Sequence, residues 1–225
     1  MLSANLSNLY QERFVSTSLD KRRINLANRE IETLALLMKL NNLKFPESGV
    51  LLDLGCGDRY LERPVSEKGI EYLGLDIDTI DFEKDKFSIE QSSVDIVVCL
   101  AVLEHLKDPS LVMSEIYRCL KPGGAVYLST PNFRYDFKNF YNDPTHVRPY
   151  TPHGAEVMLK LYGFECVKTF PGLRCKSKHW YTGALRFWRA CYLLPFAGQS
   201  KWMPSFLGGR AKSFFMLAIK PIQGA

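Results

Sequence analysis

The 225-residue sequence lacks the features that would assign it to several special classes of protein. It has no apolar run close to the ~20 residues that a bilayer-spanning helix needs. Residues 1–20 are polar and contain no signal-peptide core, so we expect a cytoplasmic protein. None of its six cysteines form a Cys-x-x-Cys pair, which argues against a thiolate zinc site.

Acidic residues are missing from the last part of the chain. Residues 166–225 hold ten Lys or Arg and no Asp or Glu, whereas residues 46–115 hold 16 acids against six Lys or Arg. A segment with charge of one sign creates a field that can attract an anionic substrate, a nucleic acid or a membrane surface. The alternative is a basic face that only keeps the protein in solution, and both interpretations stay open.

Repeats, low-complexity tracts and Pro/Gly-rich linkers are also absent, so we expect residues 1–225 to form one domain. Apolar residues at helical spacing over 24–41 predict a helix within an N-terminal extension, residues 1–45. The stretch 170–210, rich in aromatic and basic residues, is interpreted as a lid or as an insertion that covers the sheet edge, with a possible helix at 181–194.

Between these two segments, and again at the end of the chain, strands alternate with helices. The expected strands are 50–54, 72–75, 80–82, 94–100, 125–129, 163–169 and 212–220, and the expected helices are 108–120 and 152–162. Such alternation predicts an α/β fold with a mainly parallel sheet and helices on both faces.

A glycine-rich turn follows the first predicted strand and indicates a nucleoside cofactor. Gly55 and Gly57 let a ligand approach the backbone, and Asp76, 19 residues past Gly57, can accept the hydroxyl groups of a ribose. These features alone suit NAD too. However, Tyr60 replaces the third glycine of the NAD fingerprint, and Asp53 would repel a pyrophosphate but suits the ammonium group of a methionine moiety.

Four blocks then occur in an order that resembles the class I S-adenosylmethionine (SAM)-dependent methyltransferases, particularly small-molecule and glycan O-methyltransferases. The blocks are residues 50–57 (VLLDLGCG), 72–77 (YLGLDI), 94–106 (VDIVVCLAVLEHL) and 120–124 (LKPGG) followed by a strand. The resemblance spans about residues 45–170. It implies a Rossmann-like, seven-stranded sheet whose last strand is antiparallel.

The same resemblance implies which residues bind SAM. Gly55 and Gly57 would line its methionine portion, and Asp53 would hold its amino group directly or through water. Asp76 would bind the ribose, with Ile77 beside the adenine.

Two further pairs complete the expected cofactor site. Asp81 and Phe82 are the candidates for the Asp-hydrophobic pair that the family often places near the adenine amine. Leu100 and Ala101, at the end of the strand 94–100, would face the sulfonium. Arg59 stands where the family usually has glycine.

Methyl transfer to an oxygen also requires a group that removes a proton. His105 lies just past the strand 94–100, and His146 lies in a loop expected at the mouth of the cofactor pocket. His146 is therefore a candidate general base, with Asp143 or Arg148 tuning it.

Two alternatives for these histidines remain open. Glu104, His105 and His146 resemble the metal site of ubiquinone-biosynthesis and small-RNA 2′-O-methyltransferases, which use Glu-x-x-Glu-His plus a distant histidine. Ala101 replaces the first of those glutamates, so we assign no metal. In the other alternative, His105 packs at a helix start and His146 orders its loop.

The function expected from these features is SAM-dependent methylation of a hydroxyl, or another nucleophile, of a small molecule, glycan or lipid-linked acceptor. Arg134, Lys138 and Arg148 flank the same loops. They can bind a phosphate or carboxylate, which favours an anionic acceptor, or they are solvated loop charges, and both interpretations stay open. The alternatives are an RNA methyltransferase that uses the basic C-terminal segment, and a non-catalytic SAM-binding protein. Peripheral membrane contact is a further possibility.

Overall fold

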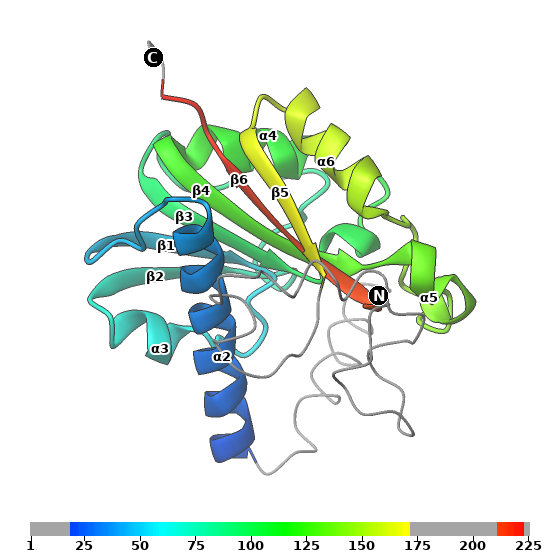
Figure 1. The fold of residues 1–225 in the computed structure, drawn as a ribbon, viewed down its shortest axis with the longest axis horizontal. Helices are drawn as coiled ribbons and strands as arrows, with labels where there is room; N and C mark the ends of the chain where they lie inside the picture. The colour runs from blue at the N-terminus through cyan, green and yellow to red at the C-terminus, as the bar shows by residue number, and fades with distance from the viewer. Residues whose placement is uncertain (1–18, 172–210, 223–225) are drawn as a thin grey trace.

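The computed structural model describes residues 19–171 and 211–222, drawn in colour in Figure 1. The helices are α2 (Leu19–Leu40), α3 (Glu62–Ser66), the 3-10 turn η1 (Leu103–His105), α4 (Ser110–Cys119), α5 (Phe133–Phe140) and α6 (Pro152–Leu161). The strands are β1 (Gly49–Leu54), β2 (Ile70–Leu75), β3 (Val94–Leu100), β4 (Leu120–Pro131), β5 (Glu165–Pro171) and β6 (Ser213–Ile219).

The strands form one sheet in the order β2-β1-β3-β4-β6-β5. Strands β1 to β4 pair in parallel, and β6 runs antiparallel between β4 and β5. The predicted mainly parallel sheet with an antiparallel last strand is confirmed. Because parallel strands end at the same edge, the turn after β1 and the segments after β2, β3 and β4 lie close together.

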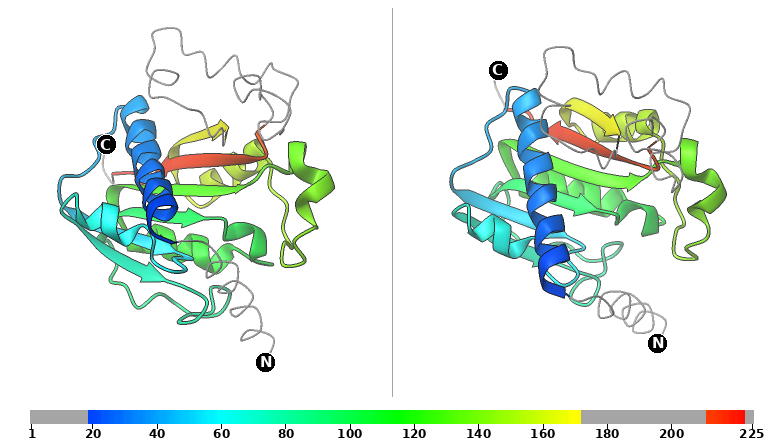
Figure 2. Two further views of the ribbon diagram at one scale, coloured as in Figure 1. Left: turned by 90° about the horizontal axis from the view of Figure 1, so that it is seen from below. Right: turned by 60° about the horizontal axis from the view of Figure 1, so that its bottom comes forward.

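Helices cover both faces of the sheet, as predicted. Figure 2 shows α2 crossing the strands on one side and α6 lying beyond β5 and β6. Alternate residues of one strand enter different cores: Ile96 and Val98 of β3 pack with α2 and α3, while Val97 and Cys99 pack with α4 and α6. The continuous apolar sequence of β3 follows from this burial on two faces.

The predicted strand at residues 80–82 is absent, and the sheet of the described residues has six strands rather than seven. The chain between β2 and β3 makes turns instead. In these turns Asp81 accepts a hydrogen bond from the backbone N–H of Glu83 (3.0 Å), and Asp85 accepts one from that of Asp81 (2.9 Å). These local side-chain bonds compete with pairing to a neighbouring strand.

The other predicted elements lie close to their expected bounds, except that α2 and β4 each begin five residues earlier than expected. The Asp108 carboxylate accepts the Ser110 backbone N–H at 3.0 Å and so caps the start of α4, as its sequence position suggests. Neither helix α3 nor helix α5 was predicted from the sequence. The proposed lid or insertion at 170–210, with its possible helix at 181–194, falls almost entirely outside the described residues. Within the described part of the chain, no helix combines the length and apolarity needed to cross a membrane.

Candidate active site

The turn after β1 has the backbone conformation that its glycines allow. Gly55 and Gly57 adopt φ values of +74° and +52°. A Cβ atom on Gly55 would lie 2.3 Å from Cγ2 of Val102, the residue just before η1. Only glycine fits there, and the turn therefore lies directly against the end of β3.

Asp76 at the end of β2 closes this turn from the other side. Its carboxylate accepts hydrogen bonds from the backbone N–H groups of Gly57 and, at 2.6 Å, Ile77. A carboxylate has further lone pairs, so these bonds leave it able to accept the hydroxyl groups of a ribose. Ile77 beside it is an exposed large apolar residue, suited to cover a flat ring.

Asp53 is buried beneath the turn, with 2% of its surface exposed. The hydroxyl of Tyr72 on β2 donates to its Oδ2 at 2.7 Å. Burial raises the pKa of Asp53 to about 7; the Tyr72 bond lowers it, Asp76 raises it and Arg59 lowers it. A cation that contacts this carboxylate would favour its ionised form.

Arg59 takes up the conformation that a glycine would have at its position. Its φ is +58°, and its backbone N–H donates to the Cys56 carbonyl at 2.8 Å. The guanidinium group lies 4.9 Å from the centre of the Tyr72 ring and pairs with Glu62. The loop therefore keeps its turn geometry although a side chain replaces the usual hydrogen.

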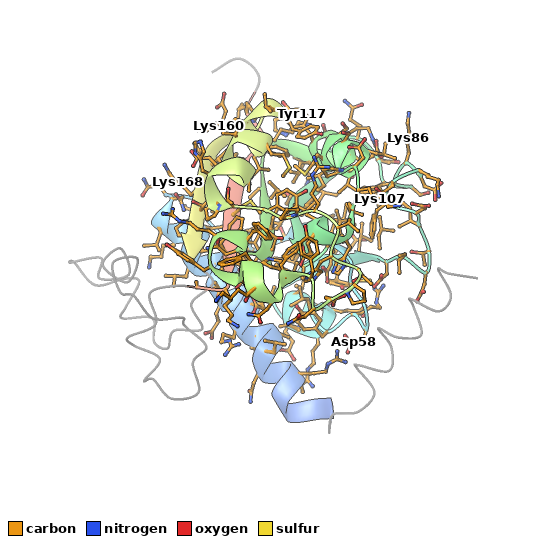
Figure 3. All side chains as sticks on the ribbon, turned by 90° about the vertical axis from the view of Figure 1, so that its right-hand side faces the viewer. Asp58, Lys86, Lys107, Tyr117, Lys160 and Lys168 are labelled. Carbon is orange, nitrogen blue, oxygen red and sulfur yellow. The ribbon has the colours of Figure 1, made fainter. Side chains whose placement is uncertain are left out.

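Helix α2 of the N-terminal extension also reaches this turn. Arg23 forms an ion pair with Asp58, and Figure 3 shows Asp58 at the end of the molecule where α2 begins. The N-terminal extension thus contacts the turn after β1.

The other predicted cofactor residues lie around this edge in different settings. The carboxylate of Asp81 accepts from the Glu83 N–H and pairs with Lys84, while Phe82 is buried with its ring 6.2 Å from that of Phe87. Leu100 ends β3, and Ala101 follows with a φ of +56°. Their proposed contacts with adenine and sulfonium remain predictions.

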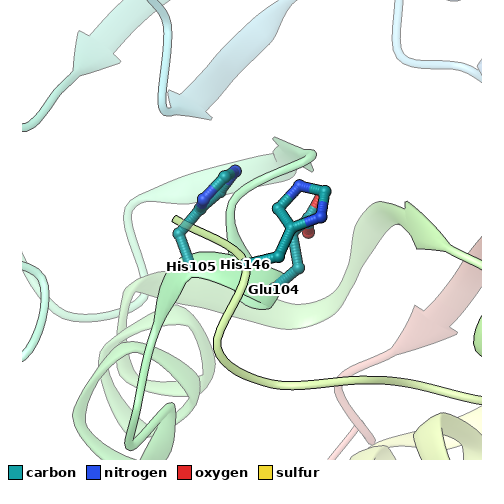
Figure 4. Close-up of side chains that lie close together, drawn as sticks. All are labelled: Glu104, His105 and His146. Carbon is teal, nitrogen blue, oxygen red and sulfur yellow. The ribbon is translucent and has the colours of Figure 1, made fainter. Parts of the chain in front are cut away.

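A second group of polar side chains gathers where β3 and β4 end. Glu104 and His105 come from η1, and His146 comes from the loop between α5 and α6. One potential ligand atom from each lies within 4.8 Å of the others, and the two imidazole centres are 4.9 Å apart. Figure 4 shows the three side chains on the same side of the ribbon. We call them the Glu–His–His cluster.

Backbone contacts bring the distant His146 to this place. The carbonyl of Glu104 accepts hydrogen bonds from the backbone N–H groups of Val147 (2.9 Å) and Arg148 (3.1 Å). The Arg148 guanidinium donates to the Lys107 carbonyl at 2.5 Å. The two residues directly after His146 are therefore fastened to η1 and to the segment that follows it.

The hydrogen bonds of His146 define where its ring proton lies. Its Nδ1 is 2.8 Å from the carbonyl oxygen of Phe140, which can only accept, so Nδ1 carries the proton and Nε2 the lone pair. A backbone carbonyl in this position commonly orients a histidine that acts as a base or ligand through its other nitrogen.

Glu104 is the most deeply buried member of the cluster, at 1% exposure. Burial raises its pKa to about 7, against smaller lowering contributions from its own backbone amide and the Thr130 hydroxyl. Neither Oε2 of Glu104 nor Oγ1 of Thr130 completes a hydrogen bond of good geometry in the described structure. Buried polar atoms of this kind usually have a hydrogen-bond partner, so a bound ligand or ion could supply the missing partner at this site.

Some of these contacts were not predictable from sequence motifs. Tyr72 and Val102 lie beside Asp53 and Gly55 because β1 pairs with β2 and β3. Thr130 lies beside Glu104 at the end of β4. The available signal is that all three lie in or within two residues of predicted strands, Val102 and Thr130 at their carboxyl ends. Asp143, proposed to tune His146, bonds to the backbone N–H and hydroxyl of Thr145 at 3.1 and 2.6 Å.

Comparison with known proteins adds the deciding observation. Residues 20–169 match the family model described as a methyltransferase domain, which covers most of the chain. The protein belongs to the class I SAM-dependent methyltransferase family. The cofactor of this methyltransferase family is SAM, and the turn at Asp53–Gly57 stands where the family resemblance implies that SAM binds.

Relatives of this methyltransferase include O-methyltransferases. It is 32% identical over 102 residues to a ubiquinone biosynthesis O-methyltransferase of Pseudomonas entomophila (strain L48), covering 36% of this chain and 44% of that protein. It is 30% identical over 137 residues to a probable S-adenosylmethionine-dependent methyltransferase of Mycolicibacterium smegmatis, covering 53% of each. The chain thus spans about half the length of these curated relatives.

Solved structures share the fold. A SAM-dependent methyltransferase from Archaeoglobus fulgidus matches with a TM-score of 0.61 and 23% identity over 94% of this chain and 98% of that one. A phosphoethanolamine N-methyltransferase 2 from Haemonchus contortus, in complex with SAM, matches with a TM-score of 0.52 and 20% identity over 84% and 52%.

Proposed function

We propose that this methyltransferase transfers the methyl group of SAM to a hydroxyl of a small-molecule, glycan or lipid-linked acceptor, and that the Glu–His–His cluster activates that hydroxyl. The observation that carries the proposal is the position of the cluster. Val102 lies against Gly55 of the cofactor turn, two residues before Glu104. A cluster able to take a proton thus follows directly on the strand end that faces the expected sulfonium.

The chemistry requires little else from the protein. The sulfonium already activates the methyl carbon, so the enzyme aligns the acceptor oxygen, excludes water and removes one proton. We assign the proton transfer to Nε2 of His146, whose Nδ1 is held by the Phe140 carbonyl at 2.8 Å. Glu104 and His105 line the same position and can stabilise the imidazolium that forms.

A divalent metal fits the same residues and gives a second version of the mechanism. Glu104, His105 and His146 supply one carboxylate and two imidazoles, a set that suits first-row divalent ions, and Oε2 of Glu104 needs a partner. A metal held there would lower the pKa of the acceptor hydroxyl. The choice between the two versions is open to a direct test.

The test measures methyl transfer from labelled SAM across glycans, quinols, nucleotides and RNA. We expect His146→Ala to abolish turnover with a hydroxyl acceptor and to leave the Kd for SAM unchanged. His153→Ala, which changes an exposed histidine of α6, is the matched control. Near-normal turnover by His146→Ala would remove the support for both versions. Loss of activity in EDTA, restored by one divalent ion, selects the metal version.

We also propose that the acceptor carries a phosphate or carboxylate. Arg134 and Lys138 are exposed on α5, on either side of its kink at Asp136, and Phe140, the last residue of α5, holds His146. We expect Lys138→Glu to raise the KM for an anionic acceptor several-fold, while the same charge reversal at Lys160 on α6 leaves the KM unchanged. RNA that binds at low salt and is methylated would favour the alternative acceptor class instead.

A further inference from the structure

Thr145 lies between the carboxylate of Asp143 and the ring of His105. Its hydroxyl oxygen is 2.6 Å from Oδ1 of Asp143 and 2.9 Å from Nδ1 of His105, and its carbonyl oxygen is 3.2 Å from the same Nδ1. Two oxygens of Thr145 therefore meet at one ring nitrogen, and Asp143 is linked to that nitrogen through the Thr145 hydroxyl. The direction of each hydrogen bond determines which nitrogen of His105 carries the proton.

The directions follow from the number of protons available. A hydroxyl has one proton, and a carboxylate oxygen can only accept, so the Thr145 hydroxyl donates to Asp143. Its lone pair then faces His105. The Thr145 carbonyl also only accepts, so Nδ1 of His105 must be the donor to both oxygens, and the lone pair of the ring lies on Nε2.

We infer that Asp143 sets the tautomer of His105 through the hydroxyl of Thr145, which makes Asp143 and Thr145 positioning residues for the Glu–His–His cluster. That this tautomer serves methyl transfer rests on the proposed function. With the proton on Nδ1, His105 presents a lone pair that can accept a hydrogen bond from the acceptor or bind a metal. With the proton on Nε2, it would present a donor and lose that ability.

Removing the carboxylate should reverse the arrangement. In Asp143→Ala the Thr145 hydroxyl loses the carboxylate as its acceptor and can donate to Nδ1 of His105. This contact, at 2.9 Å, is shorter than the 3.2 Å contact with the Thr145 carbonyl, so we expect it to prevail and to shift the ring to the Nε2–H tautomer. Removing the hydroxyl as well should undo this change. In the double variant Asp143→Ala/Thr145→Val no hydroxyl proton competes with the Thr145 carbonyl, which then favours Nδ1–H again.

The experiment is ¹⁵N NMR of histidine-labelled full-length protein above pH 8, where two-bond ¹⁵N–¹H correlations distinguish the tautomers. We expect Nδ1–H for His105 in the unmodified protein, predominantly Nε2–H in Asp143→Ala, and Nδ1–H again in the double variant. His146 is the internal control, because its Nδ1 bonds to the Phe140 carbonyl and should stay protonated in all three proteins.

Three outcomes would overturn the inference: Nε2–H for His105 in the unmodified protein, no change in Asp143→Ala, or no return in the double variant. Activity is measured in parallel. We expect kcat to fall at least tenfold in Asp143→Ala and to recover in the double variant, which a merely structural role of Asp143 would not produce. If the tautomers change as expected while no hydroxyl acceptor is methylated by any of the proteins, the proposed function fails and the hydrogen-bond relay stands.

Discussion

The affinity for SAM should increase with pH over the range in which the amino group of SAM stays charged. Asp53 is the proposed partner of that group, and burial raises its pKa to about 7 in the free protein. A carboxyl group with this pKa is about 3% ionised at pH 5.5 and about half ionised at pH 7.0. Because only the ionised form pairs with the ammonium group, the apparent affinity for SAM should rise about 15-fold between these pH values. The α-amino pKa of about 7.7–8.0 keeps the ligand protonated throughout.

Isothermal titration calorimetry at pH 5.5 to 7.0, in two buffers of different ionisation enthalpy, measures both the Kd and the protons released. Asp53→Asn should bind SAM weakly and with no pH dependence. Tyr72→Phe removes the hydrogen bond that lowers the pKa of Asp53, and it should move the midpoint of the pH profile upward. A flat profile in the unmodified protein, or an equal slope in Asp53→Asn, would refute the assignment of Asp53 to the amino group.

The stability of the SAM-free protein at different pH values gives an independent test of the raised pKa of Asp53. Because its folded-state pKa is raised from 3.8 to about 7, the folded protein binds more protons than the unfolded chain in this window. The free energy of unfolding should therefore fall as the pH rises toward and past 7. This one group contributes about 4 kcal/mol over the whole range from below pH 3.8 to above pH 7, of which about 2–3 kcal/mol is lost between pH 5 and pH 8. Asp53→Asn should lack that contribution in urea titrations at pH 5 and pH 8.

Two further predictions concern the backbone and the core. Gly55→Ala would place a Cβ atom 2.3 Å from Val102, so we expect at least a tenfold loss of SAM affinity by calorimetry. In Gly57→Ala the atom nearest to the new Cβ lies at 3.9 Å, so the loss of affinity should be smaller. An equal loss in the two variants would contradict the packing argument. Glu115→Ala removes the buried carboxylate that accepts from the Phe87 N–H at 2.9 Å and pairs with Arg118, and should cost about 2–3 kcal/mol in urea unfolding. Arg63→Ala, which breaks an exposed pair, should leave the urea midpoint unchanged.

The parts of the site that the sequence predicted are those defined within a few residues of a strand end. Gly55, Gly57 and Asp76 belong to short motifs, and their geometry depends mainly on the local turn. The contact of Tyr72 with Asp53 depends instead on the register of β1 and β2, in which Tyr72 pairs with Leu51. No spacing along the chain reveals that register.

The Glu–His–His cluster shows a similar division. The histidines were identified as candidates from their positions after strands, but their meeting depends on two backbone hydrogen bonds to the Glu104 carbonyl. The role proposed for Asp143 was tied to His146, whereas the structure joins Asp143 to Thr145 and, through it, to His105. The strand expected at 80–82 failed because acidic side chains bond to nearby backbone, a competition that apolar patterning does not measure.

The antiparallel position of β6 has a consequence for how acceptor preference can diverge. Pro171 of β5 and Thr130 of β4 both pair with Phe214 of β6, so β5 ends and β6 begins at the level where β4 ends. The two attachment points of residues 172–210 are therefore on the same edge of the sheet as the Glu–His–His cluster. Insertions, deletions or exchanges between those points leave the strand pairings of the described residues intact. We therefore expect an exchange of residues 172–210 to change the acceptor preference and to leave the residues proposed to bind SAM in place.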